Sequence, residues 1–224
     1  MIRQIERLLH HARIRLLLAF SPATLFQAIG QLDWYRDTLR EWIDDSLVRP
    51  EQHLLEVGCA TGYLTAYLAS KGHHVTGIDL SPRMIEEAGN QYPQIDFRVA
   101  KADRQHFGDG QFDGVAAASV INVTDDPGEF IDNIHPLCKP GGWITLLFPA
   151  SEFYDDGLKA LVEDLALTGF SEAALTAWHR LAPKMEVDAV KNILQHAGFA
   201  DLKTRMLFSG MVAVVSAKKC LAEG

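Results

Sequence analysis

The sequence predicts an α/β fold in which helices cover both faces of a mostly parallel, seven-stranded sheet. From residue 53 onward, short β-branched runs alternate with helical periodicity, as in parallel strands joined by helical crossovers. The first run breaks into Gly58 and Gly62, as at the ligand-binding turn of open α/β sheets. The last two runs are joined by Ser209-Gly210 alone, a link that permits a hairpin and forbids a parallel crossover.

Local patterns predict each element in turn. Strand signals cover residues 53–57, 74–79, 95–100, 112–118, 143–148, about 202–208 and about 211–217. Helical spacing covers about 63–70, the segment from 82, 127–137 and 187–197. Ser81 and Asp126 are predicted N-caps, because each precedes a proline at the first helical position.

Two segments lie outside this alternation. In residues 1–48, the pattern predicts one helix over 2–20, a second after Ser21-Pro22 and a third with Asp33 as its N-cap. In residues 150–182, it predicts helical stripes on either side of Gly169. Ligands of open sheets bind at the carboxyl ends of the strands. We therefore expect an N-terminal helical lid (1–48) and a ligand-binding domain (49–224), whose insertion (150–182) covers the ligand.

The composition narrows the function classes. With 224 residues, of which 48% are hydrophobic, the chain can bury a full core, and we expect one domain with additions. A net charge of −8 disfavours a nucleic-acid substrate, and neither a membrane span nor a signal peptide is expected. The three cysteines have no metal-like spacing, so we expect reduced thiols, no metal and a cytoplasmic location.

The most informative motif is Glu56-Val57-Gly58-Cys59-Ala60-Thr61-Gly62, followed by Asp79 at the end of the second strand. Glycines let backbone amides approach a ligand, and an acid about 20 residues later can accept from ribose hydroxyls. Asp79 follows Gly58 by 79 − 58 = 21 residues. A carboxylate at Glu56 suits a cation better than a diphosphate. The inferred ligand is therefore a nucleoside that carries a positive charge.

This motif resembles the first motif of the class I S-adenosylmethionine-dependent methyltransferases, and within them the broad type 11 branch. Ala60 stands where that family most often has glycine, and its methyl group could narrow the methionine channel. The resemblance implies a Rossmann-like sheet of order 3-2-1-4-5-7-6, S-adenosylmethionine as cofactor and S-adenosylhomocysteine as product. It also implies in-line methyl transfer to a small-molecule acceptor, which requires no metal and no nucleophilic residue.

The resemblance assigns roles in cofactor binding. Glu56 would orient the loop or meet the ammonium group through water, Asp79 would accept both ribose hydroxyls, and Asp103 would accept from the adenine amino group. The structural alternatives are a turn residue at Asp79, a solvated loop acid at Asp103 and core filling at Met84. The expected cofactor site comprises Glu56, Gly58, Cys59, Ala60, Gly62, Asp79, Leu80, Met84, Ala102, Asp103, Ala118 and Ser119.

The acceptor side is less defined. The substrate candidates are Trp34, Tyr35, Asn122, Tyr154 and Trp178. Trp34 and Tyr35 could instead staple their helix to the core, and Asn122 could serve loop hydrogen bonding. His179 is the candidate general base, since imidazole titrates near neutral pH, although a lone helical histidine is more often a surface or packed residue.

The first helix is basic and amphipathic. We expect it to pack as a lid or a homodimer contact, with peripheral contact to an anionic membrane surface as the alternative. Two other functions stay open. An NAD(P)-dependent oxidoreductase would use the same sheet, but Glu56 and the missing GxGxxG argue against it. A non-catalytic S-adenosylmethionine-binding regulatory subunit is compatible with the motif.

Overall fold

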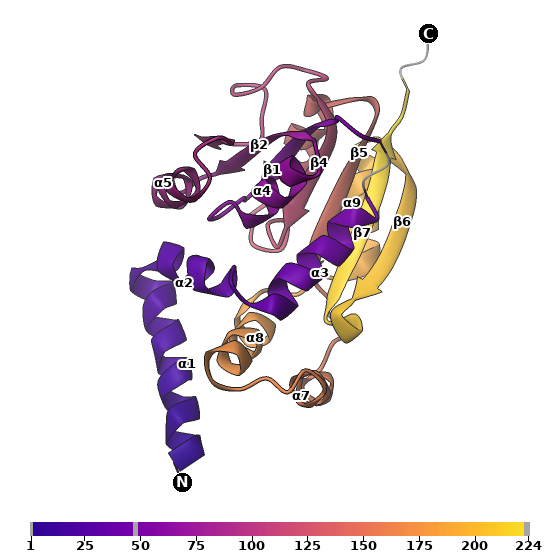
Figure 1. Cartoon of the computed structure of the whole chain (residues 1–224). Helices are drawn as coiled ribbons and strands as arrows, with labels where there is room; N and C mark the ends of the chain where they lie inside the picture. Colours follow the sequence, from indigo (N-terminus) through magenta and orange to yellow (C-terminus); the bar gives the residue numbers. More distant parts are fainter. Residues whose placement is uncertain (1, 47–48, 222–224) are drawn as a thin grey trace.

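The computed structural model describes residues 2–46 and 49–221 and contains a single seven-stranded sheet within them (Figure 1). The strands are β1 (His53–Val57), β2 (His74–Asp79), β3 (Asp96–Val99), β4 (Phe112–Ala118), β5 (Cys138–Pro149), β6 (Phe199–Leu207) and β7 (Val212–Lys219). Their order is β3-β2-β1-β4-β5-β7-β6. Strands β1 to β5 pair in parallel, whereas β7 is antiparallel to both β5 and β6. The predicted fold class and strand order are confirmed.

Four helices connect the strands of the sheet: α4 (Tyr63–Ser70), α5 (Pro82–Gln91), α6 (Pro127–Ile134) and α9 (Val187–His196). The Oγ atom of Ser81 accepts from the amide of Met84 at 3.3 Å, and Oδ1 of Asp126 accepts from the amides of Gly128 and Glu129. Both predicted N-caps are therefore confirmed, and each fixes where its helix begins.

The segments outside the alternation are helical. The N-terminal one forms α1 (Ile2–Phe20), α2 (Pro22–Ile29) and α3 (Asp33–Asp44), and the insertion forms α7 (Asp155–Asp164) and α8 (Gly169–Leu181). Figure 1 shows α1 alongside α8, with α2 leading back toward the sheet. The expected boundary at residue 48 lies outside the described residues. None of the described helices is long and apolar enough to cross a membrane.

Several predicted bounds were wrong. Strand β5 begins at Cys138 rather than 143, because Cys138 pairs with Phe112 before a register shift that leaves the extra residues in β5. Residues 135–137 form a 3₁₀ turn instead of extending α6. Strand β3 is one residue shorter at each end, and β6 begins at Phe199 because its pairing with β7 extends to Lys219. Asp33 is not an N-cap, since Leu32 holds that position without a side-chain cap.

Two apolar layers flank the sheet. Helices α6 and α9 pack on the face that contains Leu55 of β1, and helices α3 and α4 pack on the face that contains Leu54. Because side chains alternate along a strand, Glu56 points to the same face as Leu54, toward α4. On that face, Nε1 of Trp42 donates to Oγ1 of Thr145 at 2.9 Å and anchors α3 on β5.

Candidate functional site

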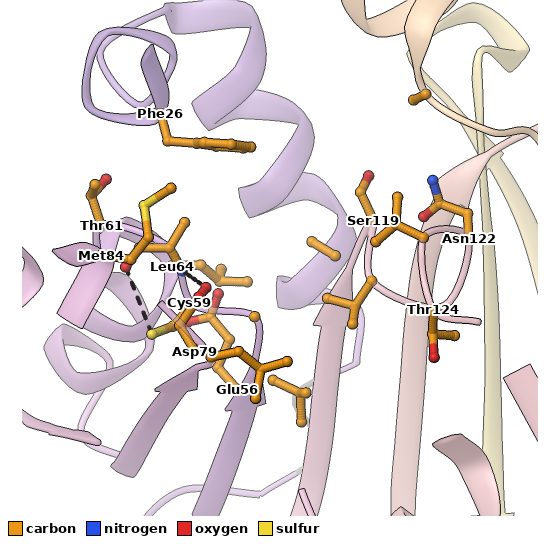
Figure 2. A pocket seen from close by; sticks show the side chains of 18 of the residues that line it. Phe26, Glu56, Cys59, Thr61, Leu64, Asp79, Met84, Ser119, Asn122 and Thr124 are labelled. Atoms are coloured by element: carbon orange, nitrogen blue, oxygen red, sulfur yellow. Dashed lines mark hydrogen bonds between the residues drawn. The ribbon is translucent and has the colours of Figure 1, made fainter. Parts of the chain in front are cut away.

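A cavity of about 860 Å³ lies at the carboxyl ends of β1, β2 and β4 (Figure 2). Its lining comes from the loops after these strands and from α1, α2, α3 and α8. A volume of this size suits a small-molecule or cofactor site. The N-terminal helices and the insertion thus contribute to the same cavity as the glycine-rich turn.

The turn after β1 forms one wall of the cavity and requires glycine at its first position. Gly58 has φ +74°, and a Cβ atom added to it would lie 2.4 Å from Cγ2 of Val120. Ala60 also adopts a left-handed conformation, with φ +47°, which is uncommon outside glycine. Gly62 does not line the cavity. With φ +84° it is the N-cap of α4, and its Cα packs so closely on Phe97 that an added Cβ would lie 2.5 Å from that ring.

Asp79 holds two turns together. Its Oδ2 accepts from the amide of Ala60 at 3.1 Å, and its Oδ1 accepts from the amide of Ser81 at 2.9 Å. The carboxylate is half-buried and lines the cavity. Since each carboxylate oxygen can accept more than one hydrogen bond, the turn role and a ligand-binding role are compatible.

Glu56 is a buried carboxylate at the base of the cavity. Glu56 is 3% exposed, and its Oε2 accepts a hydrogen bond from the hydroxyl of Thr65. Burial raises the pKa of Glu56 to about 7, with a smaller contribution from Asp79 and opposition from Thr65. Burial and Glu56 also raise the pKa of Tyr35. A cation placed here would favour the ionised form of Glu56.

A second wall comes from the segments that follow β2 and β3. Leu80 is exposed, Met84 is buried, and both line the cavity together with Ala102 and Asp103. The Oδ1 atom of Asp103 accepts from the amide of His106 at 3.2 Å and lies 2.7 Å from Nδ1 of the same residue. Desolvation raises the pKa of Asp103, but the hydrogen bonds outweigh it and keep that pKa below its usual range. Asp103 is therefore both a loop-organising residue and part of the lining.

The loop after β4 forms the opposite wall. Ala118 and Ser119 end the strand, and Ser119 has φ +55°, a left-handed conformation of the kind found at functional sites. Asn122 is 8% exposed, and its Nδ2 donates to the carbonyl of Pro183 at 3.0 Å. Among the described residues, no group hydrogen-bonds to its Oδ1. Figure 2 shows Ser119, Asn122 and Thr124 across the cavity from Glu56, Cys59 and Asp79.

Three aromatic side chains from two distant segments, α3 and α8, line the cavity. The ring of Trp34 stacks on Trp178 of α8 at 5.9 Å and on Phe208 at 5.5 Å, and its Nε1 donates to Ser171 at 2.9 Å. Tyr35 meets Trp178 edge-on at 6.1 Å. Trp34, Tyr35 and Trp178 all line the cavity. The stapling role and the lining role therefore coincide.

Besides Gly62, two residues predicted on the acceptor side lie outside the cavity. Tyr154 is 72% exposed and does not line the cavity. His179 is buried between α8 and α7, where its Nε2 lies 3.0 Å from Oδ1 of Asp155 and its ring meets Phe153 edge-on. Burial lowers the pKa of His179, although Asp155 opposes this effect. The structure does not bring His179 into the cavity.

Sequence reasoning missed the apolar lining that α1, α2 and α8 contribute to the cavity, which is called here the apolar entrance. Its residues are Ile14, Leu18, Leu25, Phe26, Ile29, Ala174, Ala177 and Leu181. For Ile14 and Leu18 the signal was the leucine-rich stripe of the first helix, which was expected to form a lid, a homodimer contact or a membrane contact rather than part of the cavity lining. Among the described lining residues, Lys101 is the only basic side chain, against six carboxylates. No group of three potential metal ligands occurs within 2–46 and 49–221.

Known proteins resemble this chain in sequence and in fold. Residues 55–146 match the family model of a methyltransferase domain. A demethylmenaquinone methyltransferase from Chlorobaculum parvum is 35% identical over 100 residues, which cover 44% of this chain and 42% of that relative. A ubiquinone biosynthesis O-methyltransferase from Pseudomonas aeruginosa is 32% identical over 139 residues, 54% of this chain and 59% of the relative. The chain thus spans about half the length of these two curated relatives.

The fold also matches solved structures. The crystal structure of an S-adenosylmethionine-dependent methyltransferase from Methanosarcina mazei superimposes with a TM-score of 0.60. The match covers 80% of this chain and 97% of that one, at 21% identity, and is a likeness in fold.

Proposed function

Because the chain belongs to the class I S-adenosylmethionine-dependent methyltransferases, we propose that it transfers a methyl group from S-adenosylmethionine to a small, largely apolar acceptor. The observation that carries this proposal is the position of Asn122. Asn122 lines the same cavity as the Gly58 turn and Asp79, and its buried Oδ1 has no hydrogen-bond partner among the residues that the structure describes.

The residues of the cavity fit the cofactor. Gly58 leaves the turn without a side chain where a Cβ would meet Val120, and Glu56 provides a buried negative charge for a cationic ligand. Asp79 would accept from the ribose hydroxyls and Asp103 from the adenine amino group. When bound, the cofactor supplies an electrophilic methyl group on a sulfonium. The chain's own task is then to align the acceptor with that methyl and to exclude water.

The opposite wall supports a proposal for the chemistry of the acceptor. A buried carbonyl oxygen without a partner costs free energy, and an O–H or N–H group of a ligand would satisfy it. With six carboxylates and a single lysine in the described lining, the cavity favours a neutral or cationic acceptor over an anionic one. The entrance lined by Leu18, Phe26 and Leu181 adds an apolar surface for the rest of the molecule.

The N-terminal helices and the insertion act as covers in this proposal. Ile14 and Leu18 of α1, Phe26 of α2 and Trp178 of α8 all line the cavity. Closing them over the ligand would exclude water from the reacting groups. Residues 1–48 are thus proposed as a lid, and 150–182 as the cover of the acceptor side.

The names of the two curated relatives suggest the first acceptors to test. One is a demethylmenaquinone methyltransferase and the other acts in ubiquinone biosynthesis, so hydroxylated aromatic compounds with apolar substituents are the first class. Such acceptors would present a hydroxyl to Asn122 and apolar surface to the entrance.

Calorimetric titration of the purified protein with S-adenosylhomocysteine and with NADH tests the cofactor. We expect tight binding of the first and none of the second, and tight binding of NADH alone would overturn the proposal. Radioactive methyl transfer to a panel of hydroxylated aromatics and amines then tests the reaction. Cofactor binding without transfer to any compound would instead support a regulatory subunit.

A further inference from the structure

Helix α1 has two apolar faces. On one face, Ile14 is buried and lines the cavity with Leu18, and Leu17 packs in the same apolar layer as α8. The other face is exposed and is called here the outer stripe, which comprises Leu8, Leu9, Ala12, Leu16, Ala19 and Phe20. These residues repeat with a helical turn of about 3.6 residues and therefore share one side of the helix.

The outer stripe is unusually apolar for a surface. Leu8 is 65% exposed, Leu9 63%, Leu16 59% and Phe20 78%. Single exposed leucines need no explanation, but a continuous exposed apolar face indicates an interaction site. Figure 1 shows α1 at the edge of the molecule, extending away from the sheet.

Arginines border the outer stripe on both sides. With about 100° per residue, Arg13 and Arg15 project on opposite flanks of the stripe. Both residues are exposed, and the guanidinium of Arg13 lies 5.5 Å from the centre of the Phe170 ring. The sequence of α1 contains four arginines and one glutamate, whereas the whole chain has a net charge of −8. With these side chains, α1 has a net charge of 4 − 1 = +3 and is a basic, amphipathic helix in an acidic protein.

This charge pattern distinguishes between two surfaces that could cover the outer stripe, a second copy of the chain and an anionic bilayer. A two-fold contact between copies through the outer stripe would bring the arginine flanks of one helix near those of the other, where like charges repel. An anionic bilayer instead offers acyl chains to the leucines and phosphates to the arginines, whose long side chains can reach the headgroups. We propose that the outer stripe of α1 docks the protein on an anionic lipid surface.

Docking would also orient the cavity. Ile14 and Leu18 line the entrance from the opposite face of the same helix. A protein held by the outer stripe would therefore keep its apolar entrance close to the bilayer, from which an apolar acceptor could enter. This consequence rests on the proposed function, whereas the docking itself does not.

Vesicle flotation with the full chain tests the proposal. The vesicles are phosphatidylcholine mixed with phosphatidylglycerol, or phosphatidylcholine alone, at low and high salt. We expect the protein to float with the anionic vesicles, more weakly with the neutral ones, and less at high salt, because screening weakens the arginine contacts. Absence of binding to anionic vesicles at low salt, or equal binding to both kinds, would overturn the proposal.

Variants locate the contact. Combining Leu9→Glu with Leu16→Glu should lower vesicle binding at least about tenfold, and Arg15→Glu should lower it at least about fivefold. The matched controls are Met206→Glu and Lys203→Glu on β6, which are exposed on another element and should bind like the wild type. Equal loss in the controls would overturn the assignment to α1.

Two readouts separate this result from other causes. Affinity for S-adenosylhomocysteine should be unchanged in the α1 variants, because Leu9, Leu16 and Arg15 do not line the cavity. That affinity also tests the proposed function independently of vesicle binding. Sedimentation velocity should show the same mass for wild type and variants. A dimer that dissociates in the leucine variant, without vesicle binding by the wild type, would make the outer stripe a homodimer contact and overturn the proposal.

Discussion

The hydroxyl of Thr65 on α4 donates a hydrogen bond to the buried carboxylate of Glu56 on β1. This contact ties the glycine-rich turn to the helix that follows it and supports a charge that burial would otherwise disfavour. Because burial outweighs the hydrogen bond, the pKa of Glu56 is raised to about 7. Two of the following predictions depend on this residue.

Glu56 should make the stability of the free protein depend on pH. Its pKa is about 7 when folded and 4.5 in its ordinary state, so between these values the unfolded chain releases a proton that the folded protein retains. Its contribution to stability is therefore present below about pH 4.5 and is lost as the pH rises to about 7, up to about 3 kcal/mol in total.

Glu56→Gln removes that titration. The free energy of unfolding of the variant, relative to wild type, should therefore increase with pH across this range, as measured by urea unfolding at several pH values. Glu86→Gln on α5 is the exposed control and should follow the wild type. Parallel pH profiles for Glu56→Gln and wild type would contradict the raised pKa.

Cofactor affinity should also depend on pH through Glu56. A cationic ligand favours the carboxylate, so affinity for S-adenosylmethionine should rise up to about tenfold per pH unit below about pH 7 and then level off. S-adenosylhomocysteine lacks the sulfonium charge and should respond less. Calorimetry on wild type and Glu56→Gln checks this, and identical profiles for the two ligands would place the sulfonium far from Glu56.

Asp79→Ala should weaken cofactor binding by about 2 to 3 kcal/mol, since it removes charge-assisted contacts to ribose hydroxyls. The variant also loses the acceptors of the Ala60 and Ser81 amides, so its unfolding must be measured alongside its affinity. Asp79→Asn keeps one acceptor oxygen, so its cofactor affinity should lie between that of the wild type and that of Asp79→Ala. Unchanged affinity for S-adenosylhomocysteine in a folded Asp79→Ala protein would exclude Asp79 from the site.

Gly58→Ala should destabilise the protein by about 1 to 3 kcal/mol, because its Cβ would meet Val120 and its φ is positive. Adding Val120→Ala should restore the part of this loss that comes from the clash. The control is Gly89→Ala within α5, where a Cβ meets nothing within 4 Å and where alanine should stabilise the helix by up to about 1 kcal/mol. Thermal unfolding compares the variants, and equal effects at the two positions would be inconsistent with this geometry.

Asn122→Leu should lower kcat/KM at least about tenfold for an acceptor that the protein methylates, because the proposed hydrogen bond from the acceptor to Oδ1 is lost. Affinity for S-adenosylhomocysteine should stay the same. Thr124→Val is the matched control in the same loop and lining, and it should retain most of the activity. A loss of cofactor affinity in Asn122→Leu would instead place Asn122 on the cofactor side.

Much of the fold could be predicted from the sequence, because turns, caps and short links depend on the local conformation of the backbone. The Gly58 turn, the acid at Asp79 and the caps at Ser81 and Asp126 are local signals, because each depends on residues within a few positions. The short link expected at Ser209-Gly210 predicted the antiparallel β7, and the observed link, residues 208–211, is also too short to cross over. The side of the cavity that we propose binds the cofactor is built from these local signals.

Only the tertiary structure decided which faces of the added helices meet the cavity. His179 and Trp178 are neighbours in α8, yet Trp178 lines the cavity and His179 is buried against Asp155 and Phe153. Trp34, Trp178 and Phe208 come from three distant segments and meet only after folding. Periodicity shows that a helix has an apolar face but not what that face packs against. Long-range packing decides which surface each apolar helix face meets, and the burial that results also raises the pKa of Glu56.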